Sequence, residues 1–147
     1  MTQASWAQQE TDRFFGDRTS PSQMQCNEIA RAISGASIVG PVDSPGSMSY
    51  TVVCNGCSGQ YHDVVVSFRE PCAVLNSEMM RLAKAIHGGL VPESTCHGTL
   101  EGADPPLLIY SMPYLRGSSY INVLSFQVEM NPGEEAKHLT FIKNLAQ

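Results

Sequence analysis

The first half of the chain carries runs of β-prone residues that are separated by turn signals. Pro45-Gly46 separates the first two runs, and Asn55-Gly56 precedes the third. Pro-Gly and Asn-Gly dipeptides between such runs are typical of hairpin turns. We therefore expect three strands, paired antiparallel in chain order, over 37–42, 48–54 and 61–68.

Three stretches have the apolar spacing of helices and also carry helix-end signals. The first follows Ser20-Pro21 and ends at Gly35, and the second starts after Asn76 and ends at Gly88-Gly89. The third starts at Asn131 and continues through 145. Serine or asparagine accepts a hydrogen bond from the first helical turn, and glycine suits the left-handed residue that closes a helix. In the second helix we expect one apolar face, formed by Met79, Leu82, Ala83 and Ile86.

The second half adds further strand signals. Residues 107–112 are almost continuously apolar, as in a strand that is covered on both faces. Residues 90–100 contain one or two extended pieces. The pattern predicts an α+β fold, with a twisted antiparallel sheet of about five strands and helices packed against one side.

Residues 1–19 differ from the rest in composition. They are rich in polar residues and contain isolated Trp6, Phe14 and Phe15. Such a segment is either a polar tail or an arm that docks through its aromatic rings, and we favour the tail. We expect the remaining residues, 20–147, to form a single domain, because this length suffices for one core.

Charge and composition exclude several kinds of partner. The net charge is −5, with 42% hydrophobic and 16% charged residues, so we expect no binding to nucleic acid or to anionic membranes. No apolar run reaches the roughly 18 residues of a membrane span, and the first residues lack the apolar core of a signal peptide. The chain is therefore expected to be cytoplasmic. Its five cysteines do not form the pattern of a secreted disulfide framework, and we expect reduced thiols.

Several segments together resemble a known family. They are GSMSYTV (46–52), VVSFR (65–69), HGGLVP (87–92), LIYSM (108–112) and LRG (115–117). Their order and spacing are similar to those of the amino-terminal lobe in fungal aminoglycoside phosphotransferase-like proteins, which have a protein-kinase-like fold. The likeness extends from about Cys26 to the end of the chain, and 137–146 looks like the helix before the catalytic loop of that family.

The resemblance implies a nucleotide site, with ATP and magnesium as cofactors. The turn at Gly46 and Ser47 would cover the phosphates, and Arg69 would take the place of the phosphate-binding lysine. Glu78 would hold Arg69 in an ion pair, as the carboxylate of the corresponding kinase helix does. Met112 belongs to the segment 111–114 that would bind adenine, where Pro113 removes one N–H donor.

One part of the phosphotransfer machinery is not found in this sequence. No His-x-Asp followed by Asn occurs, although phosphoryl transfer requires such a catalytic loop. We therefore expect a truncated or non-catalytic lobe that binds a nucleotide or another small molecule, and the catalytic residues stay unassigned. An alternative is a stand-alone lobe that binds an apolar metabolite and catalyses an isomerisation or cyclisation in a fungal secondary-metabolite pathway. Whether the chain is an enzyme stays open.

Other residues suggest a ligand or a partner. Tyr110, Tyr114 and Tyr120 cluster around the strongest strand signal of the second half, and would provide aromatic walls for a small-molecule substrate. A small lobe without its larger lobe would also expose apolar surface, either for self-association into a homo-oligomer or for a carboxy-terminal-lobe partner.

Metal and histidine chemistry is less strongly indicated. Cys54 and Cys57 have the spacing of half a zinc site, but Cys96-His97 would be a poor second pair because adjacent ligands suit one tetrahedral ion badly. We therefore expect no metal. The four histidines occur singly along the sequence, and we interpret each of them as structural rather than catalytic.

Overall fold

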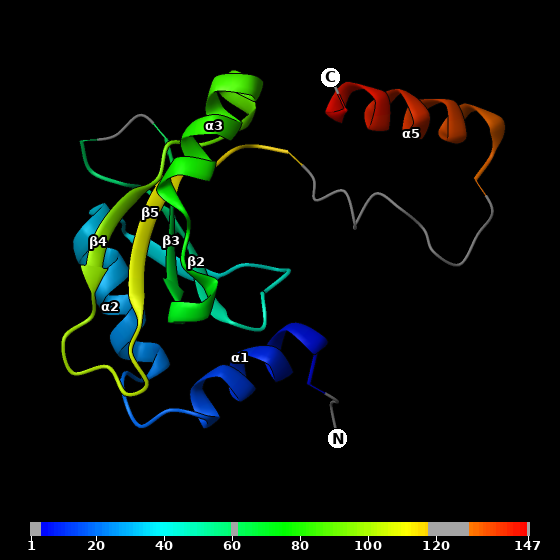
Figure 1. Cartoon of the computed structure of the whole chain (residues 1–147). Coiled ribbons are helices and arrows are strands. Elements are labelled where there is room, and N and C mark those ends of the chain that lie inside the picture. Colours follow the sequence, from blue (N-terminus) through cyan, green and yellow to red (C-terminus); the bar gives the residue numbers. More distant parts are fainter. Residues whose placement is uncertain (1–3, 60–61, 118–129, 147) are drawn as a thin grey trace. The chain divides into compact units, whose positions relative to one another are not determined.

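The computed structural model describes residues 4–59, 62–117 and 130–146, and these fall into two compact units. The first unit, Met1–Leu115, contains the sheet, and the second, Arg116–Gln147, contains the last helix (Figure 1). The division into 1–19 and 20–147 that we expected from composition stays a prediction.

An open sheet of five antiparallel strands forms the centre of the first unit, in the order β1-β2-β3-β5-β4. This arrangement confirms the predicted α+β fold. The three predicted strands form two consecutive antiparallel pairs, in which Val39 is opposite Cys54 and Tyr50 is opposite Phe68. The strands are β1 (Ile38–Pro41), β2 (Ser49–Asn55), β3 (Val64–Arg69), β4 (Thr95–Thr99) and β5 (Leu108–Pro113).

Helix α2 (Gln23–Ser34) packs against β1, β2 and β3. Its N-cap is Ser22, two residues after the predicted start, because Ser22 and Gln25 form a reciprocal capping box. Gly35 closes the helix with a left-handed backbone (φ 67°), as expected. The end signals therefore located this helix to within two residues.

Residues 6–16 form a helix, α1 (Trp6–Gly16), and not the polar tail that we favoured. Phe14 is buried, and the ring of Phe15 lies edge-on to Tyr50 of β2 with 4.8 Å between the ring centroids. Burial of aromatic surface therefore holds this segment against the sheet, which corresponds to the docking-arm alternative.

The core lies between the sheet and helices α1 and α2. Alternate residues of the central strands face it, because successive side chains of a strand point to opposite faces. The fully buried side chains include Tyr50, Val52, Cys54, Val66 and Phe68 from the strands, Leu107 before β5, and Cys26 and Ala30 from α2.

Helix α3 (Ser77–His87) begins at the predicted cap, Asn76, and ends at Gly88, where the turn η2 (Gly88–Leu90) follows. No residue of α3 is buried, and Met79, Leu82 and Ile86 are exposed. The predicted apolar face therefore exists. We expected it to pack against the core, but among the described residues nothing buries it. In Figure 1, α1 and α3 lie toward opposite ends of the strands.

The second unit contains helix α5 (Pro132–Leu145). It starts at the predicted asparagine cap: Asn131 accepts a hydrogen bond from the Glu134 N–H, and the Glu134 carboxylate accepts one from the Asn131 N–H. Among the described residues, no helix has the length and apolar character needed to cross a bilayer.

Candidate functional site

A pocket of about 400 Å³, which we call the His97 pocket, lies where β3, β4 and β5 meet the end of α2. The three strands are neighbours in the sheet, so residues distant in sequence contribute to one wall. The pocket is lined by Ile33, His62, Val64, Glu93, Thr95, His97, Ser111, Met112 and Pro113. It combines an apolar side with several groups that can form hydrogen bonds.

His97 and Ser111 form the closest polar pair in this pocket. Their side chains are joined by a hydrogen bond of 2.7 Å between Nε2 of His97 and Oγ of Ser111. The two residues lie on adjacent strands, and the pairing register shifts between Cys96 and Gly98. Gly98 has a positive φ of 86°, which glycine adopts without steric cost. A β-bulge of this kind redirects a side chain and is common beside functional sites.

An imidazole bonded to a hydroxyl can accept, donate or relay a proton. A full catalytic triad would also need a carboxylate that orients the other nitrogen of the imidazole. Glu93 lines the same pocket, but in the described part of the chain no hydrogen bond joins it to His97. The arrangement is therefore that of a proton-transfer pair in a ligand-sized pocket.

The ion pair expected between Arg69 and Glu78 is not formed. Nε of Arg69 instead donates a 2.6 Å hydrogen bond to the carbonyl oxygen of Ala73. The turn η1 (Pro71–Ala73) brings this carbonyl close to the end of β3, whereas Glu78 is exposed. Arg69 is thus hydrogen-bonded to a nearby backbone carbonyl and not to the carboxylate of Glu78.

The other predicted nucleotide-binding residues are not gathered in the His97 pocket, with one exception. Met112 lines it, whereas Gly46 and Ser47 lie in an exposed turn between β1 and β2. Gly46 does not have a positive φ, although an added Cβ would lie 3.1 Å from the hydroxyl of Ser49. A side chain at position 46 would therefore fit only if the Ser49 hydroxyl moved by a few tenths of an ångström, and the backbone there is not left-handed.

The three predicted tyrosines do not form a common wall among the described residues. Tyr110 is buried within the sheet, Tyr114 is exposed, and Tyr120 lies outside the described residues. Neither Tyr110 nor Tyr114 lines the His97 pocket.

The cysteines provide neither a disulfide nor a metal site in the described ranges. All five thiols are free, and no three metal-ligating side chains are grouped there. Burial raises the pKa of Cys26 from 9.0 to about 12, and burial also raises the pKa of Cys54. Because the thiolate is the nucleophilic form of cysteine, neither residue is suited to nucleophilic catalysis.

The pairing of His97 with Ser111 was missed in the sequence because the two residues are 14 positions apart with no motif around them. Only the alignment of β4 with β5, which sequence periodicity does not reveal, brings them together.

No family model, curated protein or solved structure matches the chain significantly, so comparison with known proteins assigns it to no family.

Proposed function

We propose that this protein binds a small organic molecule in the His97 pocket. It would move a proton from one atom of that molecule to another, as in an isomerisation or cyclisation. The observation that carries this proposal is the 2.7 Å hydrogen bond between His97 and Ser111 on the wall of a 400 Å³ pocket. A volume of this size is typical of small-molecule sites. The proposal corresponds to the metabolite-binding alternative drawn from the sequence.

The lining of the pocket indicates the chemical class of the ligand. Ile33, Val64 and Met112 provide apolar contact, whereas His97 and Ser111 provide the polar contacts. A ligand with an apolar body and one carbonyl or hydroxyl group matches both. His97 would remove a proton from the carbon beside a carbonyl, and the proton would return to another carbon of the same molecule. No oxidant or further reactant is then required.

A fragment titration tests the proposal. We would add a set of cyclic ketones and alcohols to the ¹⁵N-labelled chain and follow the backbone amides of Thr95, Ser111 and Met112 by NMR. Binding should shift these signals saturably, and a bound ketone should gain deuterium from D₂O at the carbon next to its carbonyl. The His97→Gln variant should still bind but should exchange deuterium more slowly. The absence of shifts at these amides across the whole set would contradict the proposal.

A second proposal follows from the family resemblance: a phosphotransferase-like lobe that binds ATP and magnesium near Arg69. One observation favours it. Only Nε of Arg69 has a hydrogen-bond partner among the described residues, so its two terminal nitrogens are available to an anion. Titration calorimetry with ATP and magnesium tests this proposal, with Arg69→Ala as the variant and Arg31→Ala, on the exposed surface of α2, as the matched control. Failure to bind millimolar ATP would exclude it without affecting the His97 pocket.

A further inference from the structure

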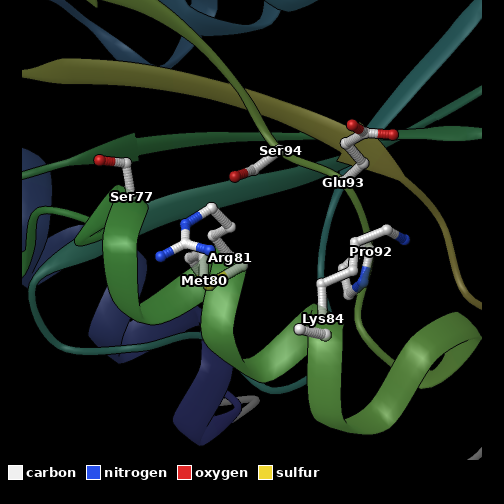
Figure 2. A pocket seen from close by; sticks show the side chains of 8 residues that line it. Ser77, Met80, Arg81, Lys84, Pro92, Glu93 and Ser94 are labelled. Carbon is white, nitrogen blue, oxygen red and sulfur yellow. The ribbon is translucent and has the colours of Figure 1, made fainter.

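A second pocket, which we call the Arg81 pocket, lies between α3 and the segment that leads into β4. Its volume is about 460 Å³, and Figure 2 shows the side chains that line it. It is lined by Ser77, Met80, Arg81, Lys84, Ala85, Pro92, Glu93 and Ser94. Of the described residues, only Glu93 lines both this pocket and the His97 pocket.

Two cationic residues on one side of α3 line this pocket. Arg81 and Lys84 are three residues apart, a spacing that places side chains next to each other on a helix. Nζ of Lys84 donates a 3.1 Å hydrogen bond to the carbonyl oxygen of Val91, which holds the ammonium group beside the pocket. The pocket thus gathers positive charge in a chain whose net charge is −5.

Arg81 is exposed, and its guanidinium has no partner among the residues that the structure describes. It forms neither a hydrogen bond nor an ion pair with any residue in the described part of the chain. Glu93 is the carboxylate of the lining, and Figure 2 shows its oxygens pointing away from Arg81. A guanidinium without a partner in a pocket of ligand size leaves its donors free for a bound anion.

We infer that the Arg81 pocket binds the phosphate group of a small organic phosphomonoester. Arg81 offers a planar fork that matches two phosphate oxygens, and Lys84 adds a second positive charge. The hydroxyls of Ser77 and Ser94 supply further donors, more than a carboxylate needs. Because Met80, Ala85 and Pro92 are apolar and the volume exceeds that of a phosphate group, the ligand would also have an organic body.

This inference does not rest on the chemistry proposed for the His97 pocket. Among the described lining residues the two sites share only Glu93, so a ligand can occupy the Arg81 pocket without involving His97 or Ser111. It is also separate from the ATP proposal, which depends on Arg69.

An NMR titration with phenyl phosphate, in which a phosphomonoester is attached to a small apolar ring, tests the inference on the full chain. The amides of Ser77 and Ser94 and the Nε–H of Arg81 should shift saturably. Charged hydrogen bonds contribute enough free energy that Arg81→Gln should weaken binding about tenfold. Arg31→Gln, which removes the same charge from the exposed surface of α2, should leave the affinity unchanged. Glutamine and arginine have similar helix propensities, and no residue of α3 is buried, so the variant should stay folded.

Two further ligands define which result counts against the inference. Inorganic phosphate should bind at the same amides but more weakly than phenyl phosphate, because it lacks the apolar ring. Benzoate, which has the ring and a carboxylate, should bind more weakly still. Equal affinity for benzoate and phenyl phosphate would overturn the assignment to phosphate. If Arg81→Gln and Arg31→Gln weakened the binding of phenyl phosphate equally, binding would reflect only general charge attraction. That result would contradict a site at Arg81.

Discussion

The guanidinium of Arg18 lies 3.4 Å from the carboxylate of Glu70, and the arginine side chain is only 1% exposed. The same group donates hydrogen bonds of 3.2 Å to the carbonyl oxygen of Phe14 and 3.1 Å to that of Pro105. It also lies 4.2 Å from the centre of the Phe14 ring. Arg18 therefore connects α1, the end of β3 and the loop before β5, and its charge is buried with partners for each nitrogen.

We predict that Arg18→Met strongly destabilises the protein. The change removes the guanidinium that donates to Oε1 of Glu70 and to two carbonyl oxygens, and removal of one partner from a buried ion pair typically costs about 3–5 kcal/mol. Because Glu70 is one-third exposed, we expect a loss below that range, about 2–3 kcal/mol, in the free energy of unfolding measured by urea denaturation.

The matched control for this prediction is Arg13→Met in α1. Arg13 pairs with Glu10 at 3.4 Å, but its side chain is 66% exposed. Solvent screens such surface pairs, and they contribute about 0–1 kcal/mol. Equal losses of stability in the two variants would show that the burial of Arg18 is not important.

A second prediction concerns stability at alkaline pH. The unfolded chain releases the proton of Cys26 from about pH 9, whereas burial raises its pKa in the folded chain to about 12. Between these values the folded state holds more protons than the unfolded state, so the free energy of unfolding falls as the pH rises. One such group lowers stability by up to about 1.4 kcal/mol per pH unit. Burial raises the pKa of Tyr50 and Cys54 as well, and both act in the same direction.

Cys26→Ala isolates this contribution. The variant should be less stable than the parent at pH 7, since a buried sulfur is lost from the core. It should then lose less stability between pH 9 and 11 in urea denaturation followed by circular dichroism. The same loss in both proteins over this window would exclude Cys26 as a source of the alkaline sensitivity.

Elements with local signals could be predicted from the sequence. Gly35, Asn76 and Asn131 set helix ends through bonds to residues within a few positions, and each appears where it was predicted. The antiparallel pairing of β1, β2 and β3 followed from turn residues in the same way. Caps and turns depend on neighbouring residues, so the sequence contains the necessary information.

Interactions between distant segments could not be predicted. The burial of Phe14 depends on its contact with Tyr50, and the bond between His97 and Ser111 depends on the register of two strands. The expected pairing of Arg69 with Glu78 failed because the carbonyl of Ala73 is a closer partner. Apolar spacing in α3 indicated a helix correctly, but spacing alone does not show what covers the apolar face.

A third prediction compares two leucines in different environments. Leu107 is 0% exposed, whereas Leu82 on α3 is 49% exposed. Leu107→Ala should cost about 2–5 kcal/mol, because it removes apolar contact and leaves a cavity. Leu82→Ala should change the free energy of unfolding by only about 0.5 kcal/mol, as is usual for surface positions. Urea denaturation measures both. A large loss for Leu82→Ala would mean that the apolar face of α3 is covered in solution.

The last prediction concerns the bond between His97 and Ser111. Ser111→Ala removes the hydroxyl that lies 2.7 Å from Nε2, so the ¹⁵N signal of that nitrogen should move toward the value of a solvent-bonded imidazole. Ser111→Thr keeps a hydroxyl, so the ¹⁵N chemical shift of Nε2 should stay close to that of the parent protein. His62→Gln serves as a control, because His62 lines the same pocket but is bonded to the backbone oxygen of Asp63. An unchanged Nε2 signal in Ser111→Ala would mean that the bond is not populated in solution, and the proton-transfer proposal would then lose its main support.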